Sequence, residues 1–172
     1  YSEVLEEIQK CHFVLDQVYS DTPMAGFAAE AAWHGKAAVV GGYGLEKLKQ
    51  YVPNGMWPPS KICHPDNIEN AIEELIVDKD QRDCIGLAAQ AFVHEKWDSV
   101  EVAKRFLRLI DGEIPESWWI DPGDVVYLEG WGQSEERTIK TIRGVVSEYG
   151  VDALRFPHHP FLARAFLDFA GI

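Results

Sequence analysis

Several features are scarce in this sequence of 172 residues, and each scarcity excludes a class of protein. Lysine and arginine total 16 against 28 aspartates and glutamates, so the formal net charge is −12. A nucleic-acid-binding protein needs a basic surface, and this composition does not supply one. The apolar runs are far shorter than the roughly 20 residues that cross a membrane. The opening stretch YSEVLEEIQK also lacks the apolar core of a signal peptide. We therefore expect neither nucleic acid as a partner nor a transmembrane segment.

Cysteine is scarce too. Cys11, Cys63 and Cys84 are odd in number and dispersed, which argues against a disulfide framework. Cys11 and Cys63 each precede a histidine, but neither pair has the two-to-four-residue spacing that lets adjacent ligands close on one zinc ion. We expect buried thiols, no metal and no cofactor. The expected compartment is the cytoplasm, with peripheral placement at the inner membrane as an option.

Apolar residues make up 47% of the chain, enough for a real core, and their pattern predicts strands at 12–18, 36–42 and 61–65. The middle run, KAAVVGG, is continuously apolar, as in strands that are buried on both faces of a parallel sheet. Helices are expected between and after the strands, at 1–11, about 23–34, 43–52 and in three segments between 66 and 110. The fold class is therefore α/β, with a Rossmann-like parallel sheet and flanking helices.

The three helices before residue 110 carry recognisable start signals. Asp66 with Glu69, and Asp98 with Glu101, form the pattern of a capping box. Asp80 is expected to open the helix between them. The last of the three has Val102, Phe106, Leu109 and Ile110 as its apolar stripe.

Residues 111–172 have a different composition, and we expect a mostly helical extension that packs on residues 1–110. The stretch 124–130 (DVVYLEG) is predicted as a strand or an extended arm. A helix follows at 134–150, with Ser134 as its cap and Gly150 as its stop, and another closes the chain at 158–172.

Three strands are fewer than the five or six of a usual doubly wound sheet. The chain also begins with a helix, so we expect it to be the C-terminal part of a longer polypeptide. In that case one sheet edge or face would be uncovered, and a longer parent chain or a partner would cover it.

The stretch GFAAEAAWHGKAAVV, at 26–40, resembles the signature of retaining nucleotide-sugar glycosyltransferases with the GT-B architecture. The positions that match in kind are Gly26, Phe27, Glu30, Ala31, Gly35, Val39 and Val40. Segment 62–110 is similar to the closing segment of that family, so the resemblance covers residues 1–110. It implies the C-terminal half of a GT-B fold, which would bind a nucleotide diphosphate sugar in bacterial surface polysaccharide or glycoconjugate synthesis.

In this family a glutamate at the position of Glu30 accepts hydrogen bonds from ribose hydroxyls, and the loop before it offers backbone N–H groups at a helix N-terminus. The donor-binding residues implied by the resemblance are Asp21, Thr22, Met24, Ala25, Gly26, Phe27 and Glu30. No catalytic residue is assigned.

The sequence departs from the family pattern in two places. The first glutamate of the Glu-x7-Glu motif is replaced by Thr22, with Asp21 one position away, and Ala37 stands where proline is usual. The basic residues that hold the diphosphate, and the N-terminal acceptor domain, belong to parts that this chain does not contain. Residues 1–172 alone are therefore expected to bind the donor without turning it over. The alternative hypothesis is a non-catalytic α/β module, derived from the same fold, for protein interaction or regulation.

Overall fold

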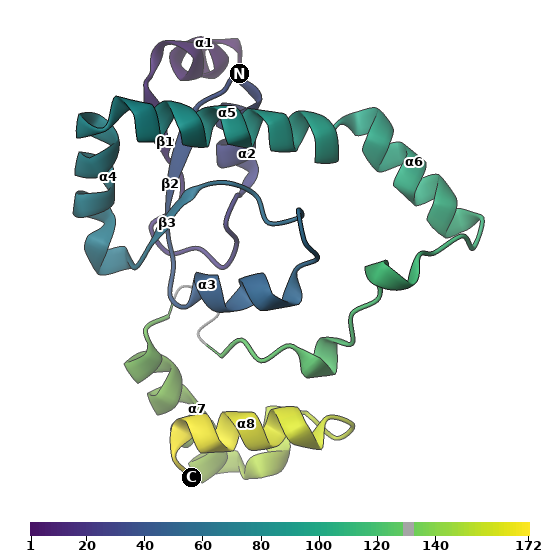
Figure 1. Cartoon of the computed structure of the whole chain (residues 1–172). Helices are drawn as coiled ribbons and strands as arrows, with labels where there is room; N and C mark the ends of the chain where they lie inside the picture. Colours follow the sequence, from purple (N-terminus) through teal and green to yellow (C-terminus); the bar gives the residue numbers. More distant parts are fainter. Residues whose placement is uncertain (129–132) are drawn as a thin grey trace.

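A computed structural model describes residues 1–128 and 133–172 (Figure 1). Its sheet has three parallel strands in the order β1-β2-β3, namely β1 (Phe13–Leu15), β2 (Ala37–Gly41) and β3 (Lys61–Cys63). Phe13 pairs with Ala37, and Val39 pairs with Lys61. Each strand lies within a segment predicted from the sequence, so the parallel α/β sheet is confirmed.

Helices connect the strands and continue after the last of them. The α-helices are α1 (Ser2–Lys10), α2 (Gly26–Trp33), α3 (Leu45–Leu48), α4 (Ile68–Val77), α5 (Lys79–Lys96), α6 (Ser99–Ile110), α7 (Glu135–Tyr149) and α8 (Pro160–Ala170). Short 3-10 turns are η1 (Lys49–Tyr51), η2 (Pro65–Asn67), η3 (Glu116–Trp118), η4 (Pro122–Asp124) and η5 (Val151–Leu154).

Both faces of β2 are buried, as its continuous apolar run predicts. Ala38 and Val40 face a core that includes residues of α1, α2 and α5. Ala37 and Val39 face a smaller core with Ala71 and Leu75 of α4. The alanines of α2 let this helix lie close to the sheet, where Ala28, Ala31 and Ala32 are fully buried.

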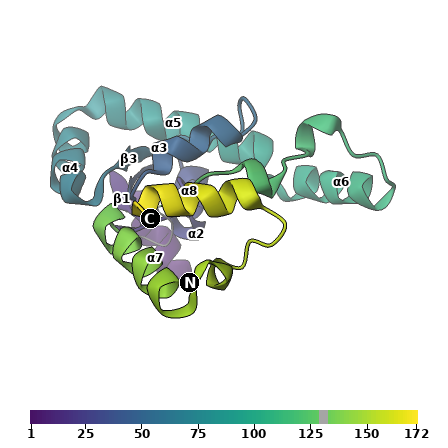
Figure 2. The same ribbon diagram turned by 90° about the horizontal axis from the view of Figure 1, so that it is seen from below.

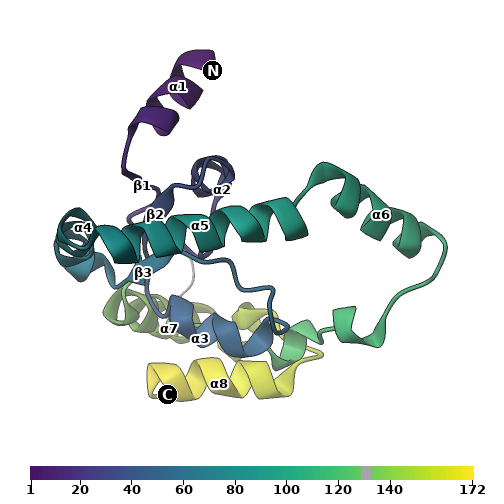
Figure 3. The same ribbon diagram turned by 45° about the horizontal axis from the view of Figure 1, so that its top comes forward.

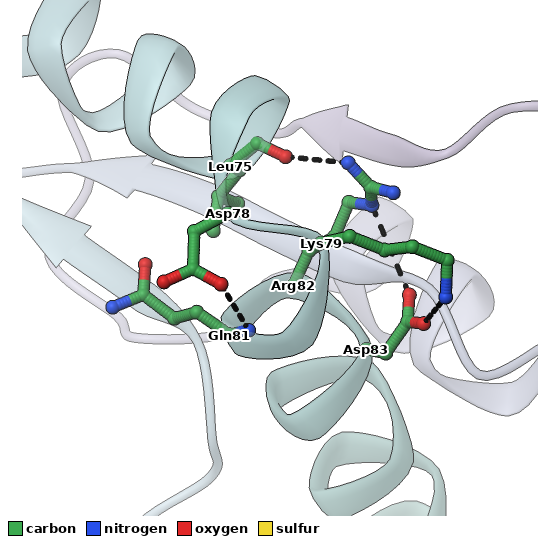
Figure 4. Close-up of polar contacts among 6 residues, drawn as sticks. All are labelled: Leu75, Asp78, Lys79, Gln81, Arg82 and Asp83. Carbon is green, nitrogen blue, oxygen red and sulfur yellow. Dashed lines mark hydrogen bonds and ion pairs between the residues drawn. The ribbon is translucent and has the colours of Figure 1, made fainter.

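The corner between α4 and α5 corrects one predicted helix start (Figure 4). Helix α5 begins after Asp78, whose carboxylate accepts a hydrogen bond from the Gln81 backbone N–H at 2.8 Å. Asp80 therefore lies inside the first turn and is not the cap. Arg82 reaches back across the corner and donates from Nη1 to the Leu75 carbonyl oxygen at 2.7 Å. This bond satisfies one of the carbonyl groups that the end of α4 leaves without a partner in the helix.

The capping box predicted at Asp66 is also wrong. Pro65 starts the 3-10 turn η2, which places Asp66 inside the turn and makes His64 its cap. The Asp66 backbone N–H donates to His64 Nδ1 at 3.2 Å, and α4 begins only at Ile68. Proline fixes the backbone angle at the first position of such a turn, and this local constraint overrides the aspartate signal.

Asp98 caps α6 as predicted, because its Oδ1 accepts hydrogen bonds from the N–H groups of Val100 and Glu101 at 3.0 and 3.3 Å. The apolar stripe of this helix, however, is not packed against the body of the protein. Helix α6 has no buried residue, and Figures 1 and 3 show it extending from the end of α5 away from the sheet.

The extension returns to the C-terminal ends of the strands. Segment 125–128 is an extended arm without strand pairing, and the remaining predicted positions, 129 and 130, lie outside the described residues. The Val126 N–H donates to the Tyr51 hydroxyl at 3.1 Å. Helices α7 and α8 pack together beyond the strand ends, on the side of α3 (Figures 1 and 2). Ser134 caps α7, and Gly150 ends it with a φ of 79°.

Candidate functional site

The loop between β1 and α2, residues 16–25 (the α2 loop), lies against the C-terminal edge of the sheet. The Ser20 N–H donates to the Gly41 carbonyl oxygen at 2.7 Å. Two glycines allow this close approach: a Cβ at Gly41 would lie 2.3 Å from the Val18 carbonyl oxygen, and one at Gly42 would lie 2.5 Å from that of Ser20. Ligands of open α/β sheets bind at this edge.

The middle of the α2 loop is a compact turn held by its own hydrogen bonds. Buried Ser20 donates from its hydroxyl to the Thr22 carbonyl oxygen at 2.8 Å and accepts from the Thr22 N–H at 3.1 Å. The Thr22 hydroxyl is 3.5 Å from the Met24 carbonyl oxygen. The Met24 side chain is buried in the core beside α2. Among the predicted donor-binding residues, Thr22 and Met24 therefore shape the loop.

The N-terminus of α2 already holds a carboxylate, which sequence reasoning missed. The Ala25 N–H donates to Asp16 Oδ2 at 3.3 Å. Burial raises the pKa of Asp16, while backbone hydrogen bonds from Ala25 and Ala28 oppose that rise. Because an anion occupies the positive end of the helix dipole, this position favours neutral hydroxyl groups over a second anion. The available signal was an aspartate placed directly after β1.

Glu30 lies one turn into α2 and is half-buried. Its Oε1 accepts a hydrogen bond from the Tyr1 hydroxyl at 3.2 Å, and this bond raises the pKa of Tyr1. Gly26 lies at the start of the same helix in open space, since an added Cβ there would meet nothing within 4 Å. Phe27, in contrast, lines an apolar groove beside β1 and α1. The carboxylate and the open backbone are thus close in the chain, and Phe27 belongs to another surface.

A cavity of about 350 Å³ lies between the α2 loop and the extension (the edge cavity). Its lining residues are Asp21, Tyr127, Leu128, Gln133, Thr138, Thr141, Ile142 and Phe166. Asp21 is the one predicted site residue among them, and Glu30 lies outside the cavity. The sequence did not indicate Thr138 and Thr141, whose spacing of three residues places both on one side of α7.

Aromatic side chains surround the same edge of the sheet. The rings of Tyr19 and Tyr43 stack with centroids 6.1 Å apart, and His64 meets Tyr43 edge-on at 5.0 Å. The Tyr127 hydroxyl donates to the Tyr43 carbonyl oxygen at 2.8 Å, which ties the extension to this group. Tyr19 is exposed, so one flat apolar surface beside the strand ends is accessible to a planar ligand.

Within residues 1–128 and 133–172, no three histidine, cysteine or carboxylate side chains converge as they would around a metal ion. Cys11, Cys63 and Cys84 are free thiols, and burial raises the pKa of Cys63. No helix in the described part of the chain is long and apolar enough to cross a membrane. Comparisons with protein-family models, curated proteins and solved structures gave no significant match. The function proposed next therefore rests on the residues of this chain.

Proposed function

We propose that this chain is the donor-binding part of a retaining, nucleotide-sugar-dependent glycosyltransferase of bacterial surface polysaccharide or glycoconjugate synthesis. One observation carries the proposal. The loop and helix start that resemble the family signature, Asp21 to Glu30, lie at the C-terminal edge of a parallel sheet beside a cavity. This is the edge at which open α/β sheets bind nucleotides.

Each group at the edge has a chemical task in this proposal. Glu30 accepts charge-assisted hydrogen bonds from two ribose hydroxyls, and its present bond to the Tyr1 hydroxyl is exposed and can be exchanged for them. The open backbone at Gly26 admits the ligand. Asp21 and Thr141 offer a carboxylate and a hydroxyl to a sugar in the edge cavity. The exposed ring of Tyr19 provides a face on which a base can stack.

The diphosphate needs cations that the described site does not supply. Among the described residues that line the edge cavity, none is lysine or arginine, and Asp16 already occupies the start of α2. Basic groups from a preceding domain of the same polypeptide, or from a partner subunit, would complete the site. Residues 1–172 alone should therefore bind a nucleotide weakly and transfer no sugar.

The same two acids favour a second candidate function. Asp16 at the start of α2 and Asp21 in the edge cavity together oppose an anionic ligand. A non-catalytic α/β module for protein interaction or regulation would retain this fold without binding a nucleotide. The two candidates make opposite predictions for a nucleotide titration.

Calorimetric titration of the chain with uridine and guanosine diphosphates tests the first candidate. Glu30→Gln is nearly isosteric and removes a charged acceptor, which costs about 1.5–3 kcal/mol, or roughly 10- to 150-fold in affinity. Tyr1→Phe releases Glu30 from its intramolecular bond and should leave affinity equal or slightly higher. Thermal melts of both variants should match the wild type, because both side chains are partly or fully exposed. A folded Glu30→Gln variant with unchanged affinity would refute the role of Glu30, and no binding by any variant would favour the second candidate.

A further inference from the structure

Helix α6 carries a broad apolar surface that nothing in the described structure covers. At 100° per residue, its apolar side chains fill half of the helix circumference, from Leu109 through Phe106 and Ile110 to Leu107 and Val100. All five are exposed, and Ile110 is 78% exposed. We call these five residues the α6 face. An apolar patch of this size on a projecting helix marks an interaction surface.

The opposite half of α6 is mainly basic. Lys104, Arg105 and Arg108 lie there, with Glu101 as the one acid, and Glu101 pairs with Lys104 at 2.6 Å. Arg108 lies over the Trp118 ring at 5.2 Å, so its charge stays beside the apolar surface. A surface with an apolar centre and basic borders is complementary to an apolar groove bordered by carboxylates.

Such a groove is present on the other side of the same molecule. A hollow of about 470 Å³ runs between α1 and the free edge of β1 (the β1 groove). Val4, Ile8, Leu15 and Phe27 contribute to its apolar lining, and the charged residues lining it are Glu3 and Glu7. The neighbouring surface of α1 is acidic overall, although Lys10 pairs with Glu7 at 2.9 Å. In the described sheet, β1 is an edge strand, as the low strand count predicted.

We propose that the α6 face of one molecule packs into the β1 groove of a second copy of this chain. Each molecule has both surfaces, so reciprocal exchange closes a two-fold dimer with two identical contacts. The doubled contact brings the buried area toward the roughly 800 Å² per partner of a standard interface. This dimer is independent of the nucleotide site proposed above.

Two other occupants of the α6 face are less favoured by its charges. Two α6 helices packed against each other would place basic borders beside basic borders, which is repulsive. An anionic membrane would attract Lys104, Arg105 and Arg108, but Asp111, Glu113 and the net charge of −12 oppose that attraction. The acidic β1 groove meets neither difficulty.

Sedimentation velocity of the whole chain over a wide concentration range tests the proposal. Ile110→Asp on the α6 face and Val4→Asp in the β1 groove should each raise the dimer dissociation constant at least tenfold. Val77→Asp is the matched control, because Val77 also ends a helix and is 77% exposed. It should leave the dissociation constant unchanged. Thermal melts identify any variant that fails to fold, and Ile110→Asp remains informative if Val4→Asp does.

Charge reversal distinguishes this contact from any other dimer. Glu3→Lys with Glu7→Lys should weaken association, as should Lys104→Glu with Arg108→Glu. Mixing the two doubly substituted proteins should restore one of the two contacts and form a heterodimer. A chain that stays monomeric at every concentration would overturn the proposal. So would a dimer that Ile110→Asp leaves intact, a failure of the mixture to associate, or a monomer that uses the α6 face to bind anionic vesicles.

Discussion

Replacing Gly86 by alanine probes the contact that fixes α2, and with it Glu30, against the sheet. A Cβ at Gly86 in α5 would lie 2.3 Å from the carbonyl oxygen of Gly35, in the turn that ends α2. The clash is with backbone and cannot be relieved by a rotamer change, so its cost should reach the upper end for overpacking, about 3 kcal/mol. Alanine gains about 1 kcal/mol over glycine in a helix. The net loss is therefore about 2 kcal/mol, or a fall in Tm of roughly 4–8 °C.

Gly144 in α7 is the matched control, because it too lies inside a helix but has open space where a Cβ would be added. Gly144→Ala should raise the free energy of unfolding by about 0.5–1 kcal/mol and the Tm by roughly 1–4 °C. Thermal melts followed by circular dichroism, with urea titrations beside them, measure both changes. If Gly86→Ala stabilised the chain as much as Gly144→Ala, the close approach of α5 to the turn after α2 would be refuted.

Three further predictions concern polar groups near the site and in α6. Because burial raises the pKa of Asp16 above its ordinary 3.8, its ionised form destabilises the fold, and the free energy of unfolding should fall as pH rises through this raised pKa. Asp16→Asn should flatten that part of a stability–pH curve measured by urea titration, and an unchanged slope would contradict the assignment. Asp98→Ala removes the cap of α6 and should cost about 1 kcal/mol, with faster amide hydrogen exchange at Val100 and Glu101; unaltered exchange there would argue against the cap. Ser20→Ala removes a buried hydroxyl from the α2 loop and should cost about 1–3 kcal/mol in urea melts, whereas a neutral effect would show that the turn holds without it.

The strands of this fold were predictable, and two helix starts were not. A run such as KAAVVGG is buried on both faces only in a parallel sheet, so sequence alone located β2 and its neighbours. Asp66 and Asp80 failed as helix caps because nearby residues competed for the same role. Pro65 imposed a 3-10 turn, and Asp78 stood two residues before Asp80 with the better geometry. Local signals of equal chemistry do not show which one the packed corner selects.

The candidate site was predictable only where its residues are neighbours in the chain. The stretch from Asp21 to Glu30 was identified because loop and helix share one signature. Asp16 was missed because its partner amide lies nine residues away, at Ala25. Tyr127 was missed because its contact with Tyr43 joins segments 84 residues apart. Periodicity and capping signals report local structure, so they carry no information about such closures.

Amide chemical-shift mapping of the isotope-labelled chain during titration with uridine and guanosine diphosphates tests the central proposal most directly. The method detects weak binding, which is what a site without its phosphate-binding cations should show. The proposal predicts shifts that saturate and that concentrate in the α2 loop, at Gly26 and Glu30, and at Thr141 on the edge cavity. Glu30→Gln should weaken the same response roughly 10- to 150-fold. Absence of any saturable shift, or shifts confined to α6 and the β1 groove, would contradict a nucleotide-sugar site at this edge of the sheet.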